Sequence, residues 1–410
     1  MASQGPPASA ASHAALSAVL TATFFVRFAF GITVAVFASY LAGRSAGLSG
    51  SDVGTAGFVS ALAPIGEFST VLFAGAAADR WGRFPVLFAG MGAAAVLFLG
   101  IATTRAVPTL GAANLAFGVA SGAILAASLA VIADRAGEDE RGYEMGRFDA
   151  MNLFGWIAGF AFGLGAEEAL SNPELDLVFV AGAAALLVGL LSGGALARGQ
   201  LGRRHVPSFD LRKVLRSAFR STVLVVTLPW LAIYSLLGTA LVFLGPAAEG
   251  VGIRPTYLAV AIATGGALLV VSQPYFGRLA DRTGRTRMMT VGAGGFVLVL
   301  LCASLLARYG VSVPLLVGIG VGVAAALAYG PAALAALADL ATEQGRATTM
   351  AIYSLTISLG MFVGLLASTT LYGRFGTVGL YPYFGAIAAV LIALTVARWV
   401  EAGRATIPVR

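Results

Sequence analysis

Apolar runs dominate this chain, and they constrain its fold more than any other feature. Of its 410 residues, 58% are hydrophobic and only 11% are charged, whereas soluble domains carry about 25% charged residues. A helix that spans a bilayer needs about 20 mainly apolar residues. The chain therefore predicts an all-α integral membrane protein. Its twelve candidate spans are 15–43, 54–77, 85–104, 108–133, 143–166, 177–197, 221–246, 256–276, 288–307, 313–338, 348–372 and 380–400.

The positive charges predict the orientation of the chain. With the N-terminus inside, 20 of the 26 Lys and Arg residues fall in inner loops and ends, and 5 fall in outer loops. Membrane proteins show this excess on the cytoplasmic side, so both termini are expected there and nucleic acid is not needed to explain the basic charge. We expect a disordered tail at 1–14, a cytoplasmic tail at 401–410, and no cleavable signal peptide.

An internal repeat organises the spans. The segment "GAAADRWGR" at 75–83 recurs as "GRLADRTGR" at 277–285, an offset of 202 residues. We call these the first and second motif copies. A second charged set recurs at an offset of 205, with Asp134, Glu138 and Arg141 matching Asp339, Glu343 and Arg346. The repeat predicts two six-helix bundles, 15–197 and 221–400, joined by a basic linker at 198–220 that is either a membrane-surface helix or a solvated loop.

On these features the chain resembles the major facilitator superfamily of secondary transporters, over nearly its whole length. The residues that match the family's loop motif are Gly75, Asp79, Arg80, Gly82 and Arg83, and in the second copy Gly277, Asp281, Arg282, Gly284 and Arg285. The resemblance implies two pseudo-symmetric bundles that move a solute by alternating access, with no enzymatic activity.

The resemblance also implies a role for the motif aspartates. Asp79 would act against the start of the eleventh span near 345–348, and Asp281 against the start of the fifth span near 142–143. A carboxylate at a helix N-terminus is stabilised by the exposed N–H groups and the dipole. Together with the second charged set, these contacts would hold the cytoplasmic side shut. The alternative is that the arginines only fix topology.

Other chemistry is disfavoured by the residues that the chain lacks. The only lysine, Lys213, follows "FDLR", so no Gly-rich phosphate-binding loop precedes it. His13 and His205 lie in the expected tail and linker, and Cys302 is the one cysteine. We therefore expect no metal site, no cofactor and no intrachain disulfide.

A buried pair of opposite charges is the leading site candidate. Glu67 lies 12 residues before Asp79, which at 1.5 Å per residue places it ~18 Å deep. Arg27 lies at a matching depth in the first span. Charges at the middle of a bilayer cost about 2.5–3.5 kcal/mol each and usually face a partner or a cavity. The pair is either a static salt bridge or the group that couples protons to transport, and Asp149 is the next candidate for that coupling.

The remaining candidates would line a solute cavity between the halves. Those expected near the midplane are Asn152, Trp156, Trp230, Tyr234 and Tyr329, and those expected nearer the cytoplasm are Gln273 and Tyr353. The alternative for the aromatic candidates is that they only pack against neighbouring helices. Because Glu67 would neutralise Arg27, the cavity suits a small amphipathic organic solute. Gly155, Gly159 and Gly163 form a small-residue stripe that predicts close helix packing.

Three hypotheses for function follow. The first is a secondary transporter acting as a monomer in a prokaryotic plasma membrane, as a proton-coupled carrier, a uniporter or an efflux pump. The second is a transporter-like sensor or scaffold that binds solute without moving it. The third, a channel, is disfavoured because the chain has neither a filter-like stretch nor a ring of acidic residues.

Overall fold

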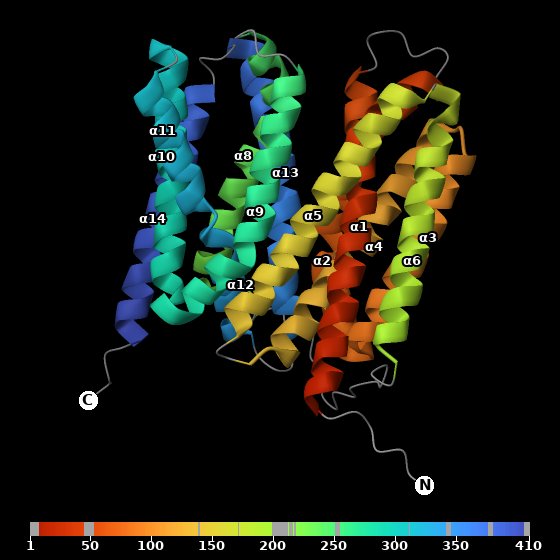
Figure 1. The fold of residues 1–410 in the computed structure, drawn as a ribbon, viewed down its shortest axis with the longest axis horizontal. Helices are drawn as coiled ribbons and strands as arrows, with labels where there is room; N and C mark the ends of the chain where they lie inside the picture. The colour runs from red at the N-terminus through yellow and green to blue at the C-terminus, as the bar shows by residue number, and fades with distance from the viewer. Residues whose placement is uncertain are drawn as a thin grey trace. The chain divides into compact units, whose positions relative to one another are not determined.

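All regular structure in the described part of the chain is helical (Figure 1). The computed structural model describes residues 8–44, 53–137, 140–170, 172–198, 212, 216, 219–250, 255–310, 312–341, 346–375 and 380–405. The helices are α1 (Ala8–Arg44), α2 (Val53–Trp81), α3 (Arg83–Thr103), α4 (Val107–Arg135), α5 (Arg141–Ala169), η2 (Asn172–Leu175), α6 (Asp176–Leu196), α8 (Ser221–Gly250), α9 (Pro255–Thr283), α10 (Arg285–Tyr309), α11 (Val313–Ala326), α12 (Tyr329–Leu340), α13 (Arg346–Phe375) and α14 (Leu380–Ala405).

Within the described residues, 8 segments are helical, long and apolar enough to cross a membrane. They fall in α1, α3, α4, α6, α8, α10, α11 with α12, and α14. Helices α2, α5, α9 and α13 are not among them. These four are the second and fifth helices of each repeat. The motif copies lie at the ends of α2 and α9, and the helix starts that they were expected to contact are those of α13 and α5.

Two expected segment boundaries differ from the structure. Helix α1 begins at Ala8, so the expectation of a disordered tail at 1–14 is wrong for residues 8–14, which are helical. Helix α14 continues to Ala405, into the segment expected as a tail at 401–410. The linker 198–220 lies almost entirely outside the described residues.

Contacts divide the chain into two compact units that cut across the two repeats. Unit 1 comprises Met1–Ala136, Ala150–Leu215 and Thr342–Leu355, and unit 2 comprises Gly137–Asp149, Arg216–Ala341 and Thr356–Arg410. The beginning of α5 therefore belongs to unit 2, and the beginning of α13 belongs to unit 1. Each repeat contributes the first turns of its fifth helix to the unit formed mainly by the other repeat.

Helix α4 is the central element of unit 1. It packs on α1, α2 and α3 (Figure 1). Most of its residues are buried. Phe117 of α4 contacts Phe98 of α3, which in turn contacts Phe179 of α6. This aromatic cluster supplies large apolar contact area between the helices.

Glycines allow the helices of unit 1 to cross at very short range. A Cβ on Gly155 would lie 2.4 Å from the Phe24 carbonyl oxygen, and one on Gly159 would lie 1.9 Å from the Phe28 carbonyl oxygen. The packing role predicted for the α5 stripe is thus confirmed. Gly66 and Gly118 likewise allow the backbones of α2 and α4 to come very close where these helices cross. These two crossings bring the polar residues of α1, α2, α4 and α5 together.

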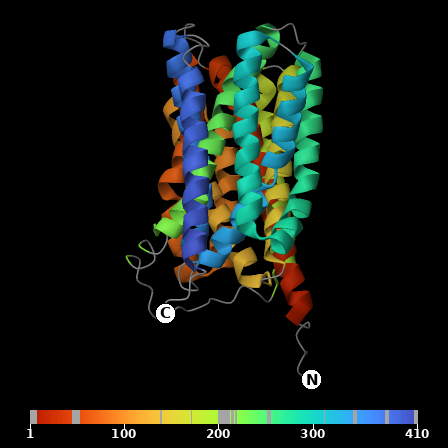
Figure 2. The same cartoon turned by 90° about the vertical axis from the view of Figure 1, so that its left-hand side faces the viewer.

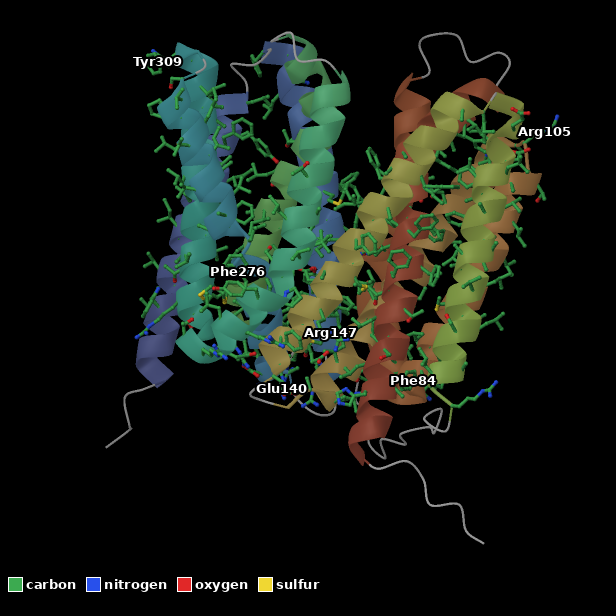
Figure 3. All side chains as sticks on the ribbon, in the orientation of Figure 1. Phe84, Arg105, Glu140, Arg147, Phe276 and Tyr309 are labelled. Atoms are coloured by element: carbon green, nitrogen blue, oxygen red, sulfur yellow. The ribbon has the colours of Figure 1, made fainter. Side chains whose placement is uncertain are left out.

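In unit 2, α10 packs against α11 and α14 (Figure 2). Glu140 and Arg147 lie at the opposite end of this unit from Tyr309 (Figure 3). The expected span 313–338 is divided here, because α11 ends at Ala326 and α12 begins at Tyr329. Pro331 explains the break: it lacks an N–H, and its ring collides with the carbonyl four residues earlier, on Leu327.

The crossing of α5 with α1 gives a test of this packing. We expect Gly159→Ala to destabilise the protein by about 1–3 kcal/mol, because the new methyl group overlaps the Phe28 carbonyl. Gly165→Ala on the same helix is the control, since a Cβ there meets nothing within 4 Å. Thermal unfolding of the detergent-solubilised variants measures the difference. Equal melting temperatures for the two variants would show that α5 does not cross α1 as described.

Candidate functional site

Arg27 of α1 and Glu67 of α2 form a buried ion pair in unit 1. The two terminal nitrogens of Arg27 each lie 3.4 Å from a different oxygen of the Glu67 carboxylate. The Glu67 side chain is 0% exposed and that of Arg27 is 6% exposed. The pairing predicted from their matching depths is therefore present. Both charges are removed from solvent, so each depends on the other for compensation.

Two further helices complete the polar contacts of this pair. Ser121 of α4 donates a hydrogen bond of 3.0 Å to the Glu67 carboxylate, and Nε of Arg27 donates one of 2.7 Å to Asn152 of α5. Gly122 follows Ser121, and a Cβ there would lie 3.3 Å from Cγ of Glu67. The buried polar network of Arg27, Glu67, Ser121 and Asn152 thus joins four helices, and it satisfies the carboxylate in its ionised form.

The first motif copy holds the beginning of α13. The Asp79 carboxylate, fully buried near the end of α2, accepts hydrogen bonds from the Thr348 backbone N–H at 3.0 Å and the Thr348 hydroxyl at 2.9 Å. Thr348 stands in the first turn of α13, where helix N–H groups have no intrahelical partner. Asp79 therefore caps α13, a helix that is distant in sequence. This is the contact that the resemblance implied.

A chain of ion pairs extends from Asp79. Arg83 lies 3.1 Å from the Asp79 carboxylate and 3.2 Å from that of Asp134 at the end of α4. Asp134 in turn accepts a hydrogen bond of 2.7 Å from Arg346, the first residue of α13. Asp134 and Arg346 of the second charged set therefore join the first motif copy in one network in unit 1, which fixes the start of α13 to α2 and α4.

The second motif copy repeats this arrangement in unit 2. The Asp281 carboxylate accepts hydrogen bonds from the backbone N–H groups of Gly142 at 3.0 Å and Tyr143 at 3.2 Å. Arg285 contacts both Asp281 and Asp339, and Asp339 also pairs with Arg141. By the repeat, Asp281, Arg285 and Asp339 match Asp79, Arg83 and Asp134, and Arg141 and Tyr143 match Arg346 and Thr348.

The two copies differ in the groups that surround the motif aspartate. The residue that takes the place of Thr348 is Tyr143, whose ring lies 4.0 Å from the guanidinium of Arg278. A cation–π contact of this kind contributes about 0.5–1 kcal/mol at an exposed site. The second cap thus includes two backbone donors, with Arg278 stacked on one of the two residues that supply them, whereas the first includes a backbone donor and a hydroxyl.

Gly82 and Gly284 each adopt a positive φ, of 103° and 97°. This conformation is strained for side chains other than glycine. It makes the tight turns between α2 and α3 and between α9 and α10. Of the other predicted gate residues, Arg80 and Arg282 are exposed, Gly75 is buried, and Glu138 and Glu343 lie outside the described residues.

Comparison with known proteins agrees with this geometry. The model of the Major Facilitator Superfamily matches residues 19–328 and 217–408. The chain belongs to the Major Facilitator Superfamily. The human organic anion transporter MFSD10 (TETRAN) has a similar structure, with a TM-score of 0.72 and 16% identity over 95% of this chain and 100% of that one. No curated protein sequence matches the chain.

A second solved structure shows the same fold. The superfamily's proton:xylose symporter XylE, bound to 6-bromo-6-deoxy-D-glucose, gives a TM-score of 0.70 and 15% identity over 96% of this chain and 95% of that one. At such low identity these two likenesses establish the fold alone.

The residues predicted to line a solute cavity, and Asp149, are divided between the two units. In unit 1, Asn152 binds Arg27, Trp156 stacks on Phe160 with ring centres 5.6 Å apart, and Tyr353 is buried. In unit 2, Trp230 packs edge-on against Tyr329, whose hydroxyl donates to the Val226 carbonyl. Tyr234 is partly buried there, while Gln273 and Asp149 are buried.

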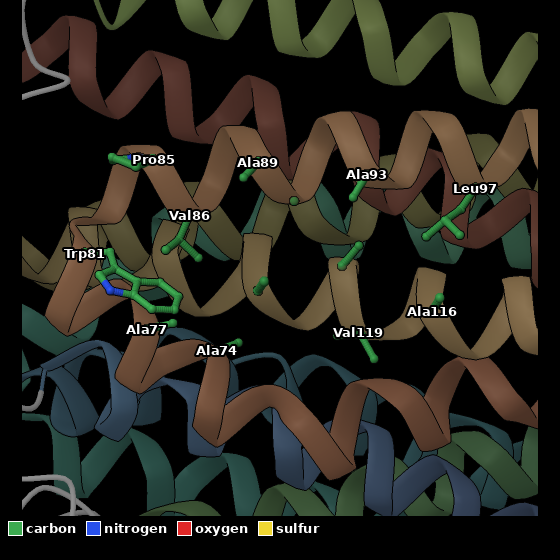
Figure 4. A pocket seen from close by; sticks show the side chains of 13 residues that line it. Ala74, Ala77, Trp81, Pro85, Val86, Ala89, Ala93, Leu97, Ala116 and Val119 are labelled. Atoms are coloured by element: carbon green, nitrogen blue, oxygen red, sulfur yellow. The ribbon is translucent and has the colours of Figure 1, made fainter.

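A separate apolar hollow of about 620 Å³ lies among α2, α3 and α4 (Figure 4). Small residues such as Ala77, Ala93 and Ala120 line it, together with Trp81 at one end. Neither the buried polar network nor a motif aspartate lines it. A predominantly small and apolar lining is typical of a lipid-facing groove between membrane helices, so we do not assign the solute site here.

Sequence reasoning missed Ser121 as a participant in these networks, because an isolated serine in an apolar run carries no signal of its own. Thr348 was predicted only as part of the start of a span near 345–348.

The cap on α13 can be tested by removing its charge. Asp79→Asn keeps the shape but weakens charge-assisted hydrogen bonds, which contribute about 1.5–3 kcal/mol each. We expect labelling of cysteines introduced at the predicted cytoplasmic ends to increase and transport to fall. Asp281→Asn is the matched variant and should act in the same direction with a smaller effect. Unchanged labelling and transport in both variants would leave the motif as a topology signal.

Proposed function

We propose that this chain is a secondary transporter that moves a small, amphipathic organic solute by alternating access. The observation that carries this proposal is the buried polar network of Arg27, Glu67, Ser121 and Asn152 in a member of a transporter superfamily. Charged groups inside membrane helices are costly, and they usually mark substrate or proton pathways.

The charge balance of the network supports the proposed solute class. Arg27 and Glu67 compensate each other, so the network offers no net charge to a strongly anionic or cationic ligand. Aromatic candidates in both units supply apolar surface that suits an amphipathic molecule. The structural relatives that transport an organic anion and xylose are organic-solute carriers by their names, which agrees with an organic solute here.

We further propose twelve spans with both termini in the cytoplasm of a prokaryotic plasma membrane. The excess of positive charge in the predicted inner loops supports this orientation. The motif caps would then lie on the cytoplasmic side, where they hold the first turns of α5 and α13. Release of these caps is the step that we propose for inward opening.

A two-stage experiment tests the transporter proposal. A thermal-shift screen of organic solutes in detergent identifies a binder, because a ligand that binds only the folded protein raises its melting temperature. Proteoliposomes loaded with the labelled binder then report whether it crosses the membrane, with protein-free liposomes as the control. Exchange of solute supports a transporter. Binding without exchange would support a sensor or scaffold instead.

Glu67→Gln decides what the ion pair contributes. If Glu67 couples protons to transport, the variant should bind solute and exchange it, but lose accumulation driven by a pH gradient. If the pair is only structural, the variant should fold poorly, because an uncompensated buried Arg27 costs about 3–5 kcal/mol. Adding Arg27→Ala should then restore expression. A well-folded Glu67→Gln protein with wild-type pH dependence would contradict coupling through Glu67.

A further inference from the structure

The apolar hollow of unit 1 is long and narrow. On α3 its lining runs from Pro85 to Leu97 (Figure 4), which at 1.5 Å per residue is a length of ~18 Å. Half of a hydrocarbon core of about 30 Å is about 15 Å thick. The hollow of about 620 Å³ therefore extends over about one leaflet of a bilayer, the distance that a single acyl chain covers.

The two ends of the hollow differ. On α2 its lining begins at Ala74, beyond the crossing with α4, where a Cβ on Gly66 would lie 2.1 Å from the Leu115 carbonyl oxygen. At the other end Trp81 lies in the lining and is 59% exposed. Tryptophan is enriched where membrane helices meet the headgroup region. A chain in the hollow would thus end near the crossing and emerge beside Trp81.

The size of the hollow is a property of the first repeat. Three alanines of its lining are matched, at an offset of 202, by larger residues of the second repeat. These pairs are Ala74 with Phe276, Ala77 with Leu279, and Ala89 with Val291. Trp81 is matched by Thr283. Since both repeats form the same helices, these residues, and not the fold alone, keep the space open.

A cationic side chain stands next to the exposed end of the hollow. Arg80 precedes Trp81 and follows Ala77 by three residues, a spacing that makes Arg80 and Ala77 neighbours on the surface of α2. Arg80 is exposed, and it forms no ion pair with the described residues. Arg83, in contrast, is held by Asp79 and Asp134. Arginine binds phosphate through strong charge-assisted hydrogen bonds, so Arg80 is the group available to a headgroup here.

From these features we propose that the hollow binds one phospholipid, with an acyl chain along α2, α3 and α4 and the phosphate on Arg80. Charge attraction to Arg80 favours an anionic headgroup. Volume and length together give the hollow a cross-section of roughly 35 Å², which suits an acyl chain and is too narrow for a helix about 10 Å in diameter. The proposal does not rest on the proposed transport function.

Native mass spectrometry of the detergent-purified protein tests the proposal, because it counts bound lipids and gives the affinity of each. We expect the wild type to bind one dioleoylphosphatidylglycerol more tightly than any further copy. Ala89→Phe fills the hollow and should weaken that binding at least about tenfold, since the chain loses buried methylene groups. Ala184→Phe is the matched control, because Ala184 is an exposed residue of α6 outside the lining.

Arg80→Gln tests the headgroup contact. Loss of the charge-assisted hydrogen bonds should weaken phosphatidylglycerol binding at least about tenfold. Arg282→Gln is the matched control, because Arg282 has the same place in the second motif copy and is also exposed. Dioleoylglycerol, which has the same acyl chains without a phosphate, should bind the wild type as weakly as phosphatidylglycerol binds Arg80→Gln.

Three results would overturn the proposal. One is equal phosphatidylglycerol binding by Ala89→Phe and Ala184→Phe. Another is equal binding of phosphatidylglycerol and dioleoylglycerol, or displacement of the lipid by inorganic phosphate, which would assign Arg80 to a soluble anion. The third is a wild-type dimer that Ala89→Phe dissociates, which would make a second copy the occupant.

Melting temperatures of the variants show whether each is folded. If Ala89→Phe does not fold, Ala93→Phe takes its place, because Ala93 is an exposed residue of the same lining. Unaltered lipid binding in the folded Ala93→Phe protein would equally contradict the proposal. The spectra do not depend on solute movement, so a failed transport assay would leave this test unaffected.

Discussion

A charge buried among apolar helices has to be compensated by its neighbours, and this constraint shapes both units. Glu67 is satisfied by Arg27 and Ser121, and Asp79 by Thr348 and Arg83. Partners from separate helices reach each other only where backbones come very close. Glycines at these crossings provide the approach, because any side chain there would overlap a carbonyl of the facing helix. Small residues and buried charges are therefore parts of one arrangement.

The motif caps connect this arrangement to conformational change. Asp79 and Asp281 each hold the first turn of a helix from the other sequence repeat. The carboxylate meets N–H groups that the helix itself cannot satisfy, so the caps stabilise the ends of α5 and α13 without help from solvent. A movement that releases either helix start has to break charge-assisted hydrogen bonds and ion pairs together. Under the proposed transport function, that cost would form the barrier between the conformations.

Much of this could be predicted from the sequence, and the reasons for the rest are physical. The repeat and the apolar runs predicted the helices, and the resemblance implied the contacts of Asp79 and Asp281 with the starts of α13 and α5. The depths of Arg27 and Glu67 predicted their pairing, since depth follows from the helical rise alone. The hydrogen bond from Arg27 to Asn152 was not foreseen, because it depends on which faces of α1 and α5 meet. The break near Pro331 was missed because the run 313–338 is apolar throughout.

Hydrogen–deuterium exchange of the wild-type protein in nanodiscs tests the central claim most directly, which is that motif carboxylates hold the first turns of α5 and α13. The internal controls are the first turns of α3 and α10, whose N-caps make no side-chain hydrogen bond. We expect the amides of Gly142, Tyr143 and Thr348 to exchange more slowly than those of the two control turns. Equal exchange in all four turns would contradict the account, because it would show that the aspartate caps do not form.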